Sequence, residues 1–164
     1  MAASQSQPST LLPNEGYWAG NEPDLLAPWL FAFAGDASRT QYHTRWLVAN
    51  RYSAFGQRGA GLPGNDDLGT LSSWCVWACL GLYPLTGRDL YVLGSPALDV
   101  ANVTFGGGEL RIVAHDQSPD NVYVRRIELN GVARTEPFVT HAELVAATAG
   151  GVGRLEFFMA VAAE

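Results

Sequence analysis

The residues best suited to chemistry lie together in one glycine-rich loop, residues 61–69, with the sequence GLPGNDDLG. Asp66 and Asp67 place two carboxylates side by side, and Asn65 adds an amide next to them. The simplest role is helix capping, because Asp at an N-cap or in a first turn stabilises a helix by about 1 kcal/mol. One Asp is enough for a cap, so the crowding of polar side chains favours a binding role as a second explanation.

Another acidic segment, Asn21-Glu22-Pro23-Asp24, lies one predicted helical hairpin earlier in the chain. If the two helices of that hairpin run antiparallel, this segment and the loop at 61–69 lie at the same end of the helices. Oxygen atoms supplied by two such loops suit a hard cation such as Ca²⁺. A cation site is therefore one hypothesis for this end of the molecule, and helix capping is the other.

The cysteines and histidines give weaker signals. Cys75 and Cys79 are four residues apart in a predicted helix, which could place two metal ligands on one face. With no His or third Cys nearby, small apolar core residues are the better interpretation. His43, His115 and His141 are widely separated and form no triad pattern with a Ser or Cys, so a structural role is expected for each.

Three helices are predicted to position the two acidic segments. The first covers about residues 23–35, where Pro23 suits the first turn and Gly35 suits the stop. The second begins at Asp36 and is expected to fade near residue 53. The third, about residues 68–82, is apolar around almost its whole circumference, which is typical of a helix buried on all sides. A small sheet cannot bury it, so we expect the helices to belong to a larger helical structure.

Beyond Pro84 the apolar residues alternate with a period of two, which predicts strands. The predicted strands are residues 90–93, 100–105, 110–114, 122–129 and 155–161. Turns are expected at Gly106-Gly107-Gly108 and at Asn130-Gly131, and the second of these is a hairpin signal. The sequence therefore predicts an α+β chain, with helices first and an antiparallel β-lobe after them.

The composition is that of a globular protein and limits its partners. Hydrophobic residues make up 48% of the chain and charged residues 16%. The net charge is −6, and no basic cluster exceeds Arg125-Arg126, so we expect no nucleic-acid partner. No apolar run approaches the ~20 residues of a membrane span. Residues 1–14 lack the basic start and apolar stretch of a secretory signal peptide.

Several longer stretches resemble glycoside hydrolase family 92, in the family's order and at sensible spacing, between Gly16 and Ala160. They are GNEPD (20–24), WLF (29–31), FAG (33–35), GLPGNDDLG (61–69), LSSWCVW (71–77), LGLYP (80–84), YVLGSP (91–96), NVYV (121–124) and LNG (129–131), followed by His141 and more weakly by FFM (157–159). Their order makes the resemblance more specific than any single motif.

Members of that family are exo-acting α-mannosidases that bind Ca²⁺ and invert the anomeric configuration. In them an N-terminal β-sandwich precedes an (α/α)₆ toroid. The resemblance implies that this chain is the C-terminal portion of such an enzyme. Residues 1–15 would be a polar leader, 16–84 the last toroid helices, and 85–164 a C-terminal antiparallel β-lobe. Mannose-containing glycans and the missing N-terminal portion of the same enzyme would be its partners, and the full-length enzyme would be secreted or periplasmic.

The resemblance also implies roles for individual residues. Asp67 matches the general base and Asp66 stands beside it, so these two are the catalytic candidates. Asn65 and Gly64, from the same loop, are the substrate-binding candidates. An inverting hydrolase also needs a separate acid, and its two carboxyl groups lie roughly 6.5–9.5 Å apart.

The metal candidates are Asn21 and Glu22, which match the segment that helps to build the calcium and substrate site in the family. A bound Ca²⁺ would hold sugar hydroxyls and help to distort the sugar ring.

The chain also departs from the family. Many relatives have an Asp at the position of Asn65, and many carry His where Leu25 and Leu26 stand, which leaves the cleaved linkage open. Cys75 replaces a common Tyr. The family's general acid, an upstream Glu, has no counterpart, because Glu15 does not match its motif. We therefore expect the isolated chain to be inactive; the alternative is a stable, non-catalytic relic or carbohydrate-binding module.

Overall fold

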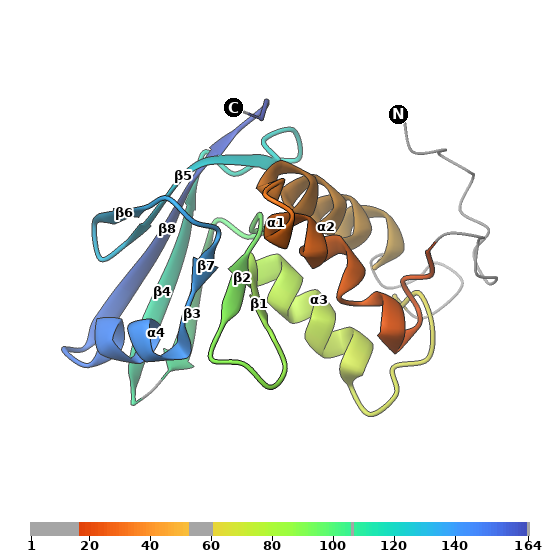
Figure 1. Cartoon of the computed structure of the whole chain (residues 1–164), viewed down its shortest axis with the longest axis horizontal. Coiled ribbons are helices and arrows are strands. Elements are labelled where there is room, and N and C mark those ends of the chain that lie inside the picture. Colours follow the sequence, from red (N-terminus) through yellow and green to blue (C-terminus); the bar gives the residue numbers. More distant parts are fainter. Residues whose placement is uncertain (1–16, 53–60, 106, 164) are drawn as a thin grey trace.

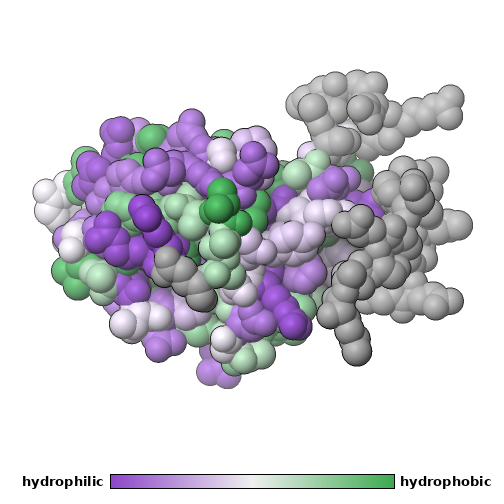
Figure 2. Space-filling model, turned by 90° about the horizontal axis from the view of Figure 1, so that it is seen from above, coloured by the Kyte–Doolittle hydropathy of each residue, from purple (hydrophilic) through white to green (hydrophobic). Residues whose placement is uncertain are grey.

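The computed structural model describes residues 17–52, 61–105 and 107–163. The predicted leader at residues 1–15 and residues 53–60, which precede the glycine-rich loop, lie outside these described residues. The helices of residues 22–51 and 70–80 occupy one side of the molecule, and most strands lie on the other side together with the helix of residues 141–148 (Figure 1). The presence of both helices and sheets confirms the α+β prediction. Polar and apolar residues are interspersed over the face seen in Figure 2. None of the helices among the described residues has the length and apolar character that a membrane crossing requires.

The first helical segment is irregular. It consists of two 3₁₀ turns and a short helix: Glu22–Asp24, Ala27–Trp29 and α1 (Leu30–Phe33). The prediction of one continuous helix is therefore wrong. Pro23 and Pro28 lack the N–H group that a helical ladder needs, so each starts a new turn. The segment stops at Gly35 as predicted, with a φ of 79°.

The other two predicted helices are present as α2 (Ala37–Arg51) and α3 (Thr70–Leu80). Asp36 caps α2 by accepting a hydrogen bond from the Arg39 N–H group at 3.2 Å. Helix α3 buries Leu71, Trp74, Ala78 and Leu80. Its Val76 is 60% exposed, so the expectation of a helix buried on all sides is wrong for the described part of the chain.

A three-stranded antiparallel sheet separates two apolar cores. Its strands are β1 (Leu82–Pro84), β2 (Tyr91–Leu93) and β7 (Phe138–Val139), in the order β1-β2-β7. Successive side chains of a strand point to opposite faces. Tyr91 and Leu93 therefore join the core of the β-lobe, whereas Val92 joins the core formed by the helices. The central strand of this sheet is thus buried on both faces.

A five-stranded sheet forms the rest of the β-lobe. Its strands are β3 (Val100–Phe105), β4 (Gly108–His115), β5 (Tyr123–Leu129), β6 (Val132–Arg134) and β8 (Val152–Ala160), in the order β3-β4-β8-β5-β6. The predicted hairpin joins β5 to β6, with positive φ at Asn130 (50°) and Gly131 (78°). The predicted all-antiparallel lobe is wrong at one pair, because β8 runs parallel to β4. A long connection makes this possible, since the chain passes through β5, β6 and β7 before it returns.

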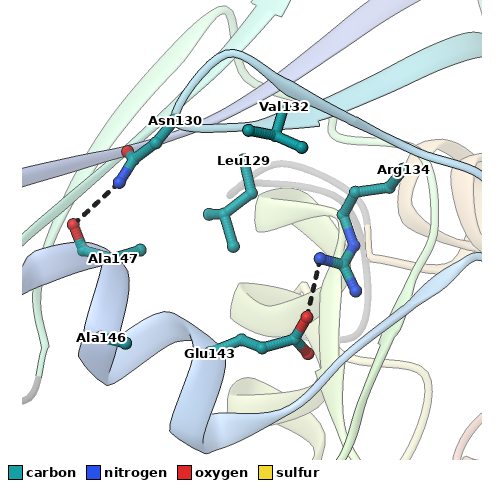
Figure 3. A pocket seen from close by; sticks show the side chains of 7 residues that line it. All are labelled: Leu129, Asn130, Val132, Arg134, Glu143, Ala146 and Ala147. Atoms are coloured by element: carbon teal, nitrogen blue, oxygen red, sulfur yellow. Dashed lines mark hydrogen bonds and ion pairs between the residues drawn. The ribbon is translucent and has the colours of Figure 1, made fainter.

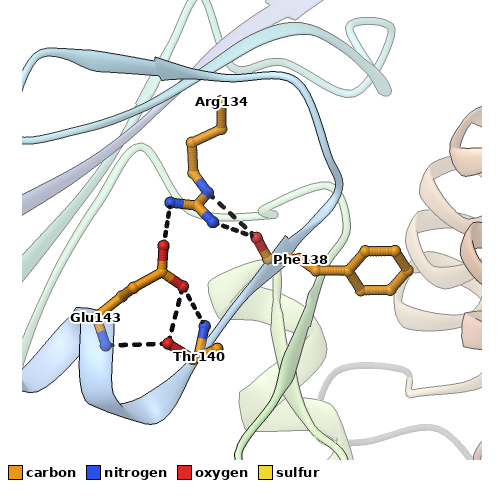
Figure 4. A network of polar contacts seen from close by, with 4 residues as sticks. All are labelled: Arg134, Phe138, Thr140 and Glu143. Carbon is orange, nitrogen blue, oxygen red and sulfur yellow. Dashed lines mark hydrogen bonds and ion pairs between the residues drawn. The ribbon is translucent and has the colours of Figure 1, made fainter.

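A fourth helix, α4 (His141–Thr148), was not predicted and packs against the five-stranded sheet. A reciprocal capping box starts it: Thr140 Oγ1 accepts from the Glu143 N–H group at 3.1 Å, and Glu143 Oε2 accepts from the Thr140 N–H group at 2.7 Å. Arg134 ties this cap to the sheet by binding Glu143 at 3.0 Å and the Phe138 carbonyl at 2.7 Å (Figure 4). These bonds lower the pKa of Glu143, those from Thr140 most.

Thr140→Ala is expected to destabilise the fold by roughly 0.5–2 kcal/mol in urea unfolding at neutral pH, as loss of an N-cap does. Because the folded state lowers the pKa of Glu143, its carboxylate stabilises the fold above the ordinary value of 4.5 and loses this effect on acidification. The difference from wild type should therefore shrink below that pH. Thr135→Ala, at an exposed loop position, is the matched control and should unfold like wild type.

Candidate active site

The two acidic segments lie side by side, as the sequence predicted. Gly20 and Gly64 meet backbone to backbone, and a Cβ built on Gly20 would lie only 2.7 Å from the Pro63 oxygen. A second tie is the hydrogen bond from Trp74 Nε1 to the Leu25 carbonyl, at 2.8 Å. Residues 20–25 and the loop at 61–69 are therefore fastened together at one end of the helices.

Gly64→Ala is expected to destabilise the fold by roughly 1–3 kcal/mol, because the added methyl group would overlap the Gly20 backbone. Gly20→Ala should destabilise the fold by a similar amount. The double variant should lose less stability than the sum of the two single variants, because both methyl groups disrupt the same backbone contact. Gly150→Ala is the control, because a Cβ there has no neighbour within 4 Å. Urea midpoints for the four variants measure these differences, and an additive double variant would contradict the contact.

Asp66 holds the loop to the start of α3. Its two carboxylate oxygens accept from the Ser72 N–H group at 2.8 Å and from the Ser72 hydroxyl at 2.7 Å. Its carbonyl accepts from the Thr70 N–H group at 2.8 Å. The bonds from Ser72 lower the pKa of Asp66, so it is ionised at neutral pH. The N-cap residue of α3 is Gly69, which has no side chain to cap it. Asp66, three residues earlier, instead satisfies the N–H group of Ser72 in the first turn of the helix.

Asp67 is placed differently from its neighbour. It is exposed and has a φ of 44°, and the next two residues, Leu68 (62°) and Gly69 (89°), are also left-handed. A left-handed backbone is tolerated by Asp but unfavourable for Leu, and such strain costs on the order of 1–3 kcal/mol. None of the hydrogen bonds found among the described residues involves the Asp67 carboxylate, whereas its carbonyl accepts from Thr70 Oγ1 at 2.7 Å. The loop therefore presents this carboxylate on a strained backbone.

The two substrate-binding candidates have different surroundings. Asn65 is exposed directly before Asp66. Gly64 is half-buried against Gly20, and this close approach explains why a glycine is needed there. Both precede Asp67 closely in the sequence. The four predicted residues of the loop, 64–67, therefore form one short continuous segment.

The segment with the metal candidates, residues 21–24, also contains one acidic residue that holds the backbone and other residues that do not. Asp24 accepts from the Trp18 N–H group at 3.1 Å and so closes the turn. Asn21 is exposed and its side chain makes no capping hydrogen bond. Glu22 Oε1 is buried, and none of the described residues offers it a hydrogen-bond partner. A buried carboxylate oxygen without a partner is energetically unfavourable. Binding a cation would satisfy this oxygen, so it is suited to be one of the ligands of a cation site.

The described residues do not supply a complete metal site. Among them there is no group of three or more His, Cys, Asp or Glu side chains that could hold a metal ion. Glu22 and Asn21 could therefore provide only some of the six to eight oxygen ligands that Ca²⁺ takes, the others coming from backbone carbonyls, water, substrate or other parts of the protein.

An aromatic layer supports the site, and sequence analysis missed it. Tyr52 stacks on Trp74 with ring centroids 5.2 Å apart, and Trp29 stacks on Tyr83 at 4.8 Å. Burial raises the pKa of Tyr52 and of Tyr83, so both stay neutral at physiological pH. These residues come from four separate segments, so their spacing in the sequence gave no signal of their meeting.

A shallow pocket of about 320 Å³ lies elsewhere, between the β5–β6 hairpin and α4. Leu129 and Val132 line it together with Ala146 and other residues (Figure 3). Its charged groups, Arg134 and Glu143, are bound to each other at 3.0 Å. The described residues that line this pocket therefore offer no free carboxylate, whereas the loop at 61–69 exposes that of Asp67.

Comparisons with known proteins show which family the chain resembles. The profile of the glycosyl hydrolase family 92 catalytic domain matches residues 2–160. An uncharacterized secreted glycosidase from Arthroderma benhamiae is 32% identical over 128 residues, which cover 76% of this chain and 16% of that protein.

Solved structures give the same result. A family 92 α-mannosidase from Bacteroides thetaiotaomicron in complex with mannoimidazole matches with a TM-score of 0.79 and 28% identity, over 89% of this chain and 18% of that one. An inverting mannosidase of the family from the same organism matches with a TM-score of 0.75 and 30% identity, over 89% and 19% of the two chains. The chain thus spans less than a fifth of the length of these relatives, and it belongs to glycosyl hydrolase family 92.

Proposed function

We propose that the protein to which this chain belongs is a calcium-dependent, inverting exo-α-mannosidase that releases terminal α-mannose from glycans. The observation that carries the proposal is the exposed Asp67 carboxylate on its strained loop, which meets the segment of Glu22 through the contact between Gly64 and Gly20. Support comes from the solved relatives, one an α-mannosidase and the other an inverting mannosidase. Secretion of the full-length protein is proposed in the same way, because the curated relative is a secreted glycosidase.

In this proposal Asp67 is the general base. Its carboxylate takes a proton from the water that attacks the anomeric carbon, on the face opposite the leaving group. Asp66 is a positioning residue, because Ser72 occupies both of its carboxylate oxygens. Asn65 and Gly64 would line the sugar site beside the base. A separate acid must protonate the leaving oxygen, and we place it in the part of the enzyme outside this chain.

Calcium would be held in part by Asn21 and Glu22. When bound, it would supply a positive charge that binds sugar hydroxyls and favours a distorted ring. The exposed Asn21 side chain and the unpartnered Glu22 oxygen support these two assignments.

We also propose that α1, α2 and α3 are the last helices of an (α/α)₆ toroid. The exposed side of α3, where Val76 is 60% accessible, supports this proposal, because further toroid helices would cover it.

The full-length protein should release mannose from terminal α-mannosides, and proton NMR during the first minutes should show the β-anomer before mutarotation. The isolated 164-residue chain should release none, because it lacks the acid. Appearance of the α-anomer first would contradict inversion, and absence of any release by the full-length protein would contradict the proposed activity. Calcium-dependent mannose release by the chain alone would show that the acid lies within it.

A further inference from the structure

Cys75 and Cys79 lie one turn apart on α3, and both are free, half-buried thiols. Residues four apart on a helix have Cβ atoms about 5–6 Å from each other. A disulfide needs Cβ atoms about 3.5–4.5 Å apart, so the intact helix prevents these two sulfurs from bonding directly. A metal ion between the two sulfurs lets the sulfur atoms stand up to roughly 4.6 Å apart, since each metal–sulfur bond is about 2.3 Å long. Such a bridge therefore reaches farther than a disulfide bond.

A buried cation lies next to this pair. Arg45, only 8% exposed, donates to the Pro96 carbonyl at 2.6 Å and to the Ser118 carbonyl at 2.8 Å. The N–H group of the same Pro96–Ala97 peptide donates to the Cys79 carbonyl at 2.9 Å. Arg45 and Cys79 are therefore held against one peptide group.

The charge of Arg45 is not compensated by a carboxylate. Both of its hydrogen-bond acceptors are neutral backbone carbonyls, and none of the ion pairs found in the described part of the chain includes it. An unpaired buried charge is unfavourable. A negative group beside Arg45 would therefore be stabilised, and the thiol of Cys79 is a group whose charge acts on Arg45.

We propose that Cys75 and Cys79 form a two-sulfur binding site for a soft monovalent d¹⁰ cation, of which Cu⁺ is the physiological representative. Thiolates are the ligands that select such ions. On binding, both thiols release their protons to solvent, and the ion keeps its oxidation state. Two thiolates and one monovalent cation carry a net charge of −1, which Arg45 neutralises. A divalent ion would make the centre neutral and leave Arg45 uncompensated.

The acidity of the two thiols supports the assignment. Hydrogen bonding from Cys75 lowers the pKa of the Cys79 thiol, and the Arg45 charge lowers it further. The same hydrogen bond and burial raise the pKa of Cys75. Cys79 is thus the more acidic of the two thiols, and both give up their protons when the ion binds.

The test uses Ag⁺ as an air-stable probe with the full-length protein, kept reduced by a phosphine. Native mass spectrometry counts the bound ions, and competition titration gives the affinity. Wild type should hold one Ag⁺ that the double variant Cys75→Ser/Cys79→Ser lacks. Each single Ser variant should bind this ion roughly 100-fold more weakly or worse, because the second ligand no longer acts intramolecularly. Circular dichroism checks that each variant is folded.

A relocated thiol provides the matched control. Cys75→Ser combined with Ser73→Cys keeps the number of thiols but puts them six residues apart, which a helix places on different faces. Ser73 is exposed, so the exchange should leave the fold intact. This variant should bind Ag⁺ as weakly as the single Ser variants. Wild-type affinity in the relocated variant, or no loss of affinity in the single variants, would overturn the two-sulfur site.

Discussion

Replacing Asp67 by Asn in the full-length enzyme is expected to lower kcat roughly 100- to 10,000-fold on an α-mannoside, the range that a general base contributes. Asn cannot accept the proton of the attacking water, although its size is nearly the same. It also tolerates a left-handed backbone, so the φ of 44° at this position should be kept. The loss should therefore appear in the rate of the reaction and not in the stability of the fold.

Thermal melting separates this role from a structural one. Asp67→Asn should keep the melting temperature of wild type while its kcat falls. Asp120→Asn, an exposed aspartate in the β-lobe, is the matched control and should retain full activity. An unchanged rate in Asp67→Asn would mean that another carboxylate is the base.

Removing calcium with a chelator is expected to abolish activity in the full-length enzyme, and adding Ca²⁺ should restore it. Glu22→Gln should raise the Ca²⁺ concentration needed for half-maximal activity on the order of 10- to 100-fold, since it removes one charged ligand from the ion. The variant also replaces a buried carboxylate oxygen that has no hydrogen-bond partner, so its fold should be at least as stable as wild type without calcium.

Two measurements distinguish the loss of a calcium ligand from a nonspecific effect of the substitution on the protein. Glu136→Gln, at an exposed loop position, should leave the calcium requirement unchanged. The Ca²⁺-induced rise in melting temperature should be smaller in Glu22→Gln than in wild type, because a weaker site stabilises the folded state less. Equal calcium affinity in wild type and Glu22→Gln would place the ion elsewhere.

Much of the fold could be predicted because local signals decided it. The alternation in β3 gave its bounds, Val100–Phe105, without error. Asn130-Gly131 marked the hairpin correctly, since a positive φ at both residues is what that turn needs. Helix α4 was missed, although Thr140 and Glu143 form a capping box in the sequence, because its eight residues are too few to show a clear helical period. The parallel pairing of β4 with β8 depends on strand order, which periodicity does not encode.

The candidate site was only partly visible in the sequence. Crowded polar residues marked the loop at 61–69, and the hairpin argument correctly brought it next to residues 20–24. Nothing in the sequence separated the structural Asp66 from the exposed Asp67, since that difference depends on where Ser72 lies. The partnerless oxygen of Glu22 also results from tertiary packing, which a pattern of residue types cannot reveal.

The position of β8 has a consequence for biosynthesis. This strand is the last of the described strands in the chain, yet it lies in the middle of its sheet, between β4 and β5. While the ribosome is still producing α4, the earlier strands exist but have no central partner, so the β3–β4 and β5–β6 pairs can form only as separate hairpins. The lobe can close only after residues 152–160 have left the exit tunnel. Chaperones that shield the exposed edges of β4 and β5 would therefore act late in translation, and premature termination before Val152 would yield an open, aggregation-prone sheet.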